Sequence, residues 1–338
     1  MDWKTYWQNL LTEKKLNAKV DDLDKRDLNI LGHEPWTERI CKGICNSYEE
    51  LEKRLEIVKQ DCIKELGSIE GVYQTFGRVK TRDSLLCKVI EKRWKKADAF
   101  DNKYYELDEY NYNKIITDLI GIRLIMNYRG KWLDVHRKIL EIFPLMDQSL
   151  YEKKKPLEHR PGEKFQAEWP NVYHAKTDSA QQYKEEGLHV NPQTKGYRSI
   201  HYILSYKETY IELQLRTIYD EAWGECDHNY VYKKEANRSH GALLRLSEIL
   251  NRLTSLSDIL NDTMKSVYDK EGIINGKQKE TWAALPEHIN SIDEIIGKID
   301  EVGSDLKAFR NQLICKQEDC DGTGKKRTGT GDAFSGTD

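Results

Sequence analysis

One segment constrains the fold of this chain more than any other. Residues 115–128, IITDLIGIRLIMNY, are almost continuously apolar. A strand that is covered on both faces has this composition, because neither of its two alternating rows of side chains meets water. The run is too short to cross a bilayer as a helix, which takes about 20 apolar residues. We therefore expect residues 115–128 to form a central strand of a buried sheet.

The segments around this strand alternate between strand and helix periods. Strands are predicted at Val72–Phe76 and in a hairpin made of YRSIHYILSY, a turn at residues 207–209, and YIELQLRT. Helices are predicted at Ser84–Lys96, Trp132–Phe143 and Thr217–His228. Residues 145–195 are polar and contain four prolines, which favours a long loop or small insertion at the rim of a site.

Helical patterns occupy both ends of the chain. In the N-terminal part, the clearest helix is predicted to begin at Asn46-Ser47, with Glu50 as the capping-box partner, and to end at Gly67. After residue 240, apolar residues recur every three or four positions. This spacing predicts a helical hairpin packed on the core, and a homo-oligomer formed through the same stripes is the second interpretation.

The C-terminal residues are rich in Gly and Thr and have too few apolar side chains to pack, so we expect them to be disordered. The GTGKK within them is not a phosphate loop, because no strand precedes it and the motif spacing fails. The chain is thus divided into four parts. They are an N-terminal helical extension (1–66), a central domain (67–240), a C-terminal helical region (241–314) and a tail (315–338).

The composition is that of a charge-rich protein, with 33% charged residues and a net charge of −3. This balance argues against a nucleic-acid-binding surface over the whole molecule. The N-terminus is polar and acidic where a signal peptide is basic and then apolar, and no apolar run could span a membrane. We expect a cytoplasmic protein with no membrane partner.

Seven cysteines are scattered without a regular framework, which favours reduced thiols over disulfides. Cys41 and Cys45 lie one helical turn apart, and Cys315 and Cys320 flank a polar segment, so zinc is an alternative. The second Cys pair or His pair at ligand spacing that a zinc site requires is missing.

Polar side chains gather on one face of the predicted hairpin. Alternation along the strand places Glu212, Gln214 and Arg216 on the same face. The preceding strand contributes Tyr197, Ser199 and His201. A ring for stacking, donors for phosphate and a carboxylate are what a nucleotide site requires. The alternative is a strand whose outer face is simply solvated.

Asp118 interrupts the most apolar segment of the chain. A carboxylate beside Leu119 and Ile120 is costly to bury unless it is paired or holds a cation. Together with Glu212 it makes a Mg²⁺ site plausible, because Mg²⁺ is usually held by one or two carboxylates and substrate phosphates. Exposure to solvent or pairing with Arg123 is the alternative.

A basic connection precedes the predicted helix at residue 84. Arg78, Lys80 and Arg82 lie in it, and Lys88 lies one turn into the helix. A polyphosphate would fit at a helix N-terminus surrounded by cations. A solvated basic face is the alternative.

Five segments occur in an order that resembles the synthetase domain of RelA/SpoT alarmone synthetases. They are GRVKTRDSLLCK (77–88), TDLIGIR (117–123), GYRSIH (196–201), ELQLRT (212–217) and EAWGECDH (221–228). The resemblance runs from about Val72 to Lys234, roughly half the chain. It implies an α+β fold with a mixed β-sheet flanked by helices, similar to nucleotidyltransferases, to which the helical extensions are added.

The resemblance also implies roles for individual residues. It assigns ATP phosphate binding to Arg78, Lys80, Ser84 and Lys88. Asp118 would be a Mg²⁺ ligand, and Glu212 would help to hold the metal and activate the acceptor 3′-hydroxyl. Tyr197 would stack on the acceptor guanine, with His201 and Gln214 as polar contacts. These roles suit in-line phosphoryl-type transfer, which needs a metal, cations and a base.

The implied activity is transfer of pyrophosphate from ATP to GDP or GTP, giving the alarmone (p)ppGpp. The sequence lacks the His-Asp dyad of the family's hydrolase domain, so we expect a synthetase-only member. Two alternatives stay open. One is a toxic member that modifies adenosine nucleotides or the 3′ end of tRNA, with lysines 153–155 and 233–234 as phosphate contacts. The other is an inactive module that senses nucleotides.

Overall fold

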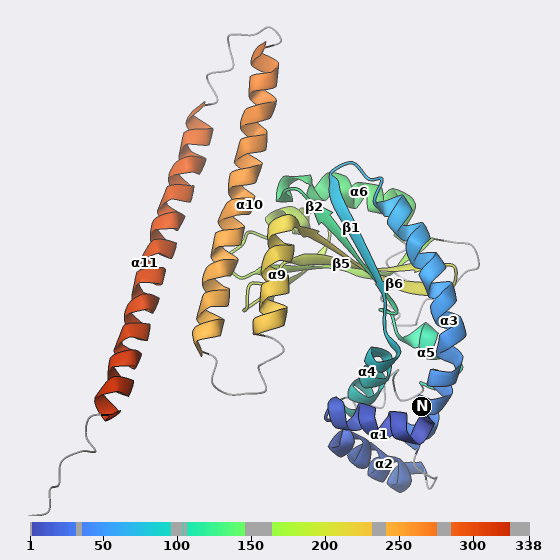
Figure 1. Cartoon of the computed structure of the whole chain (residues 1–338). Helices are drawn as coiled ribbons and strands as arrows, with labels where there is room; N and C mark the ends of the chain where they lie inside the picture. Colours follow the sequence, from blue (N-terminus) through green and yellow to red (C-terminus); the bar gives the residue numbers. More distant parts are fainter. Residues whose placement is uncertain are drawn as a thin grey trace, which may run out of the picture. The chain divides into compact units, whose positions relative to one another are not determined.

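The computed structural model describes residues 2–31, 36–95, 104, 107–145, 164–231, 241–275 and 285–324. The chain divides into two compact units, Met1–Ile218 and Tyr219–Asp338, and each is described by itself below. The first unit contains a β-sheet with helices around it, and the second contains helices among its described residues (Figure 1).

A mixed six-stranded sheet organises the first unit, in the order β1-β2-β6-β5-β3-β4. The strands are β1 (Val72–Val79), β2 (Ile120–Met126), β3 (Phe165–Ala175), β4 (His189–Gln193), β5 (Ser199–Tyr206) and β6 (Thr209–Thr217). β2 pairs antiparallel with β1 and parallel with β6, while β5 and β6 form an antiparallel hairpin. The structure confirms the predicted α+β class, the mixed sheet and the hairpin. Its turn consists of Lys207 and Glu208, both with positive φ.

The predicted central strand is confirmed, but it is shorter than residues 115–128. A short helix, α5 (Tyr112–Ile115), and a turn containing Asp118 precede β2. Within β2 the side chains of Ile120, Ile122 and Leu124 are fully buried. Ile116 and Leu119, which precede the strand, are buried as well, so both halves of the segment contribute to the core although only the second half is extended. Gly121 and Arg123, on the other face of β2, are only half-buried, so the strand is not fully covered on both faces as predicted.

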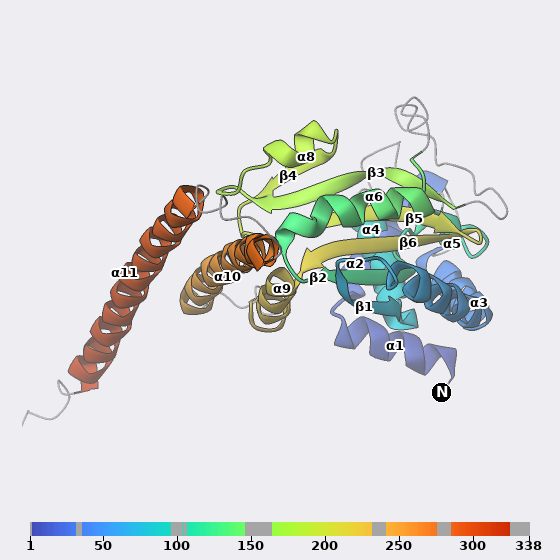
Figure 2. The ribbon, with the colours of Figure 1, turned by 90° about the horizontal axis from the view of Figure 1, so that it is seen from above.

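One face of the sheet packs in the core beneath α6 (Trp132–Ile142), which lies across the strands (Figure 2). Here His136 of α6 forms a hydrogen bond between its Nδ1 and the hydroxyl of Tyr202 on β5, at 3.0 Å. Burial lowers the pKa of His136 to about 4, so the imidazole is neutral at pH 7.

The N-terminal helices belong to the first unit rather than forming a separate extension. They are α1 (Trp3–Glu13), α2 (Asn17–Leu31) and α3 (Trp36–Leu66), and they pack with α4 (Arg82–Lys95). Trp94 on α4 donates a 2.7 Å hydrogen bond to Asp22 on α2. The predicted start of α3 at residue 46 was wrong, because the hydroxyl of Ser47 donates to the Ile44 carbonyl one turn earlier instead of capping a new helix.

Residues 145–195 were predicted to form a long loop or a small insertion, and the described residues 164–195 are not a loop. This part forms β3, α8 (Gln181–Glu185) and β4. Prolines are tolerated at bulges and on edge strands. Pro170 lies within an irregularity of β3 between Glu168 and Asn171, and Pro192 lies on the edge strand β4. Pro156 and Pro161 are outside the described residues.

The second unit contains α9 (Ile218–Tyr230), α10 (Gly241–Asn275) and α11 (Leu285–Gly324). The predicted helix at 217–228 and the C-terminal helical hairpin are confirmed. Two predicted boundaries differ: the units divide after Ile218 instead of residue 240, and α11 extends to Gly324, into the tail predicted as disordered. Good helix formers such as Lys316, Gln317 and Glu318 favour this continuation. Residues 325–338 are outside the described residues.

Among the residues that the structure describes in both units, no helix is long and apolar enough to cross a membrane.

Candidate active site

The face of the sheet opposite the core carries the polar residues that the sequence singled out. Across the sheet, Arg78 of β1 pairs with Gly121 of β2, and Gly121 pairs with Glu212 of β6. Directly opposed residues of neighbouring strands project to the same face. Arg78 and Glu212 therefore stand on one face, in one row, with a glycine between them.

The Arg78 side chain lies against Gly121. A Cβ at residue 121 would lie 3.6 Å from Nε and 3.7 Å from Cγ of Arg78. The Arg78 side chain thus extends over β2 along the row that contains Glu212. A guanidinium and a carboxylate from strands far apart in sequence are brought onto one surface.

A continuous hydrogen-bond network runs from Glu212 along the hairpin. Gln214 Nε2 donates to Glu212 Oε1 at 2.5 Å, and Arg216 Nη2 donates to Gln214 Oε1 at 2.7 Å and to the Tyr197 hydroxyl at 2.5 Å. The Tyr197 hydroxyl is 2.9 Å from His201 Nε2. The structure thus brings together Glu212, Gln214, Tyr197 and His201, as the strand alternation predicts.

His201 is neutral in this network. Burial and the nearby Arg216 guanidinium lower the pKa of His201 to about 3. Its Nδ1 lies 3.8 Å from Glu212 Oε1, and because the ring is uncharged this contact is not an ion pair. The neutral His201 ring therefore provides no counter-charge to the Glu212 side chain.

Asp118 lies between two lysines in the turn before β2. Its carboxylate oxygens are 3.1 Å from Lys80 Nζ and 2.7 Å from Lys88 Nζ. Burial alone would raise the pKa of Asp118, but the charges of Lys88 and Lys80 outweigh it and lower the pKa. The Lys80 amide donates to the Leu119 carbonyl at 2.8 Å, which holds the end of β1 beside this turn.

The predicted basic connection forms the start of α4. Thr81 Oγ1 accepts a hydrogen bond from the Ser84 amide at 3.3 Å and donates to Ser84 Oγ at 2.8 Å, so Thr81 acts as the N-cap. Ser84 is exposed there. Arg82, counted with the basic cluster from sequence, instead points its Nη1 at Cys45 Sγ of α3, 3.6 Å away.

The two carboxylates have separate partners in the structure. Asp118 pairs with two lysines, and Glu212 accepts from Gln214. Within the described part of the chain, no three His, Cys, Asp or Glu side chains form a group that could hold a metal ion by themselves. Any Mg²⁺ at this face would need further ligands from a bound phosphate chain, which is how Mg²⁺ usually binds.

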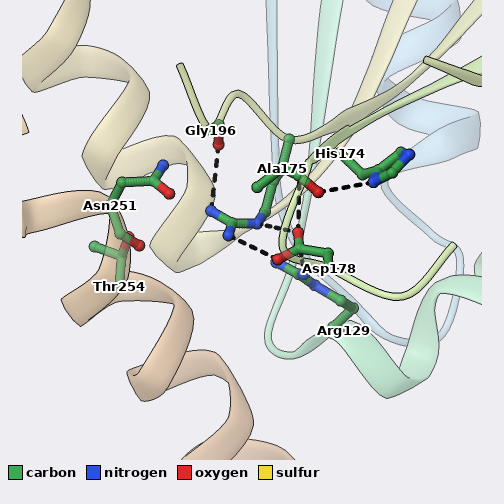
Figure 3. A network of polar contacts seen from close by, with 8 residues as sticks. Arg129, His174, Ala175, Asp178, Gly196, Asn251 and Thr254 are labelled. Carbon is green, nitrogen blue, oxygen red and sulfur yellow. Dashed lines mark hydrogen bonds and ion pairs between the residues drawn. The ribbon is translucent and has the colours of Figure 1, made fainter. Parts of the chain in front are cut away.

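Sequence reasoning missed an ion-pair network around Asp178 that includes Arg198, the residue after Tyr197 in the chain (Figure 3). Arg198 donates from Nε to Asp178 Oδ2 at 2.6 Å and from Nη2 to Asp178 Oδ1 at 3.0 Å. Arg198 Nη1 also donates to the Gly196 carbonyl at 3.2 Å, and Arg129 Nη1 lies 3.6 Å from Asp178. Gly196 has φ +79°, which favours glycine. This pair fixes the backbone on both sides of Tyr197. Arg198 is in the GYRSIH motif, but nothing in the sequence indicates that Asp178 is its partner.

Asp178→Ala is expected to destabilise the protein by about 3–5 kcal/mol, because it leaves the Arg198 guanidinium buried without its counter-ion. The Arg198 side chain is only 7% exposed. The measurement is the free energy of unfolding in denaturant. Asp134→Ala is the matched control, since Asp134 is 61% exposed beside Lys131 and should cost about 1 kcal/mol or less. Equal losses in the two variants would contradict the structural role of the Asp178–Arg198 pair.

Comparison with known families adds one decisive finding. Residues 77–237 match the model of the region found in RelA/SpoT proteins. The chain contains a RelA/SpoT region. All of the predicted site residues, from Arg78 to Gln214, lie within this RelA/SpoT region, as do Asp178 and Arg198.

Several solved structures resemble the chain. Small alarmone synthetase 1 from Bacillus subtilis is 16% identical, with a TM-score of 0.41, over 66% of this chain and 99% of that one. Its complex with its product pppGpp gives 16% identity and a TM-score of 0.42, over 67% and 99% of the two chains. A GTP pyrophosphokinase family protein from Streptococcus pneumoniae is 16% identical, with a TM-score of 0.35, over 69% and 92%. No curated protein matches the chain.

Proposed function

We propose that the RelA/SpoT region transfers the β,γ-pyrophosphate of ATP to the 3′-hydroxyl of GDP or GTP. The observation that carries this proposal is the row formed by Arg78, Gly121 and Glu212. At one end of this row is Arg78, on the strand that leads to the cations at the start of α4, and at the other end is the Glu212 carboxylate on β6. A polyphosphate donor and a hydroxyl acceptor need these two kinds of group side by side.

In this proposal the ATP phosphates bind at the start of α4. Arg78, Lys80 and Lys88 supply positive charge, and Ser84 supplies a hydroxyl in the first turn, where the helix dipole also favours an anion. Lys80 and Lys88 already hold the Asp118 carboxylate between them. Because these ammonium groups cluster around one half-buried anion, they are poised to bind another.

We propose Asp118 and Glu212 as the ligands of a Mg²⁺ ion that arrives with the nucleotide. Both offer hard oxygen donors, and both lie beside cations that would attract the phosphate chain. When bound, Mg²⁺ would neutralise charge on the transferred group and orient it.

The chemical step assigns proton transfer to Glu212. The acceptor 3′-oxygen attacks the β-phosphorus of ATP, the bond between that phosphorus and the α,β-bridging oxygen breaks, and AMP leaves. Glu212 takes the proton from the attacking hydroxyl. The neutral His201 beside it supports this role, since an imidazolium there would hold the carboxylate in an ion pair.

The acceptor base is proposed to stack on Tyr197, with His201 and Gln214 as polar contacts. The network from Arg216 holds the Tyr197 hydroxyl, and the Asp178–Arg198 pair holds the backbone around it. An aromatic side chain that is held both at its hydroxyl and at its backbone can stack on a base with little further loss of conformational entropy.

An acceptor screen tests this function. The purified protein is incubated with γ-labelled ATP, Mg²⁺ and each of GDP, GTP, ADP, ATP and tRNA. Label is expected on the guanosine nucleotides. Label on adenosine nucleotides or on tRNA would keep the chemistry but overturn the proposed acceptor. Transfer to none of them would contradict the enzymatic function and favour an inactive nucleotide-binding module.

A further inference from the structure

The helical hairpin of α10 and α11 has a core of its own. Ile249 and Leu256 on α10 pack against Val302 and Phe309 on α11. On each helix these residues are seven positions apart, the spacing of one row of a coiled coil. The two helices run antiparallel, side by side (Figure 1).

A second apolar row on each helix is left partly exposed by the residues that the structure describes. These side chains also recur every seven residues and are between 37% and 53% exposed. On α10 they are Leu246, Leu253, Leu260 and Val267, and on α11 they are Ile299, Leu306 and Leu313. A coiled coil of two helices buries both of its apolar rows. This hairpin buries one row and leaves the other in water.

The ion pairs of the hairpin show on which side the uncovered rows lie. Arg252 on α10 reaches Asp305 on α11, and Arg245 reaches the same carboxylate at 3.0 Å. At 100° per residue, Arg252 and Leu253 lie on opposite sides of the buried Ile249 and Leu256. Asp305 and Leu306 likewise lie on opposite sides of Val302. Ion pairs therefore lie on one flank of the contact between the two helices. The uncovered apolar rows of both helices lie on the opposite flank.

The uncovered flank is wider than a single row. Met264 on α10 is 63% exposed and lies four residues after Leu260. Ile296 on α11 is 51% exposed and lies three residues before Ile299. At Gly303, nearby on α11, a Cβ would meet no atom within 4 Å. Three apolar positions per heptad are typical of helices in bundles, whereas two suffice for a two-stranded coiled coil.

We propose that this flank is the docking surface for a second copy of the chain, and that the two hairpins form an antiparallel four-helix bundle. Each hairpin supplies two apolar rows, and a four-helix core consists of such rows from four helices. A two-fold axis pairs a surface with itself, so an apolar flank that spans both helices of the hairpin is suited to it. The nine side chains expose on the order of 800 Å² per chain, about what one partner contributes to a standard stable interface.

The test is the mass of the full-length protein in solution, measured by sedimentation equilibrium at micromolar concentration. The wild type is expected to have twice the mass of the 39.7 kDa chain. The variant Leu253→Glu/Leu306→Glu is expected to have the mass of one chain. Both leucines are about 40% exposed, so the hairpin itself should fold and its circular dichroism should be unchanged.

Leu244→Glu is the matched control. Leu244 is on the same helix and is 41% exposed, but it lies off the uncovered flank, so this variant is expected to stay dimeric. A monomeric wild type would overturn the proposal. So would a double variant that remains dimeric, because the copies would then associate through another surface.

Discussion

Glu212→Gln is expected to lower the rate of pyrophosphate transfer by about 10²–10⁴-fold, the usual contribution of a general base. Glutamine has the same shape and can still accept the hydrogen bond from Gln214, but it can neither take a proton nor carry a charge. The affinity for ATP measured without Mg²⁺ is expected to change little, because the proposed phosphate contacts come from β1 and α4 and Glu212 is proposed to meet the phosphates only through the metal ion. The measurements are the rate of AMP formation and the dissociation constant of ATP by calorimetry.

The matched control for this variant is Glu141→Gln. Glu141 lies on the surface of α6, paired with Lys138, and its side chain is 62% exposed. The Glu141→Gln variant should retain the activity of the wild type. An active Glu212→Gln variant would show that another group takes the proton.

Tyr197→Ala is expected to raise the KM for the acceptor by about 5–150-fold, the equivalent of the roughly 1–3 kcal/mol that stacking of a base on an aromatic ring contributes. The KM for ATP is expected to stay the same. Tyr197→Phe keeps the ring and loses only the hydroxyl that contacts Arg216 and His201. Most of the acceptor affinity should therefore remain in the phenylalanine variant.

The comparison of the two Tyr197 variants separates stacking from hydrogen bonding. If alanine and phenylalanine weaken the acceptor equally, the hydroxyl and not the ring carries the effect. A rise in the KM for ATP in either variant would contradict the assignment of Tyr197 to the acceptor. Steady-state kinetics with each substrate varied in turn distinguishes these results.

The regular parts of the fold could be predicted because their patterns are local. Alternation in residues 197–217 is sufficient to predict the hairpin, and the unbroken apolar run predicts β2. The strands β3 and β4 could not be predicted in this way. Their prolines are compatible with strands only at a bulge and at a sheet edge, and the pairing that creates a bulge or an edge is not local.

The candidate site shows the same division. Alternation puts Glu212 and Gln214 on one face, and the family motifs single out Tyr197 and His201. The approach of Arg78 over Gly121, by contrast, depends on the register between β1 and β2. The contact of Asp178 with Arg198 brings together two residues that are 20 positions apart, one after β3 and the other before β5. Neither contact leaves a periodic trace in the sequence, so only the structure reveals them.

The central claim is that this face moves a pyrophosphate group and not a single phosphate. Following α-labelled ATP with Mg²⁺ and the active acceptor tests it most directly. The expected result is labelled AMP, formed only when the acceptor is present and in equal amount to the pyrophosphorylated product. Labelled ADP together with a singly phosphorylated acceptor, or ADP without any acceptor, would contradict it.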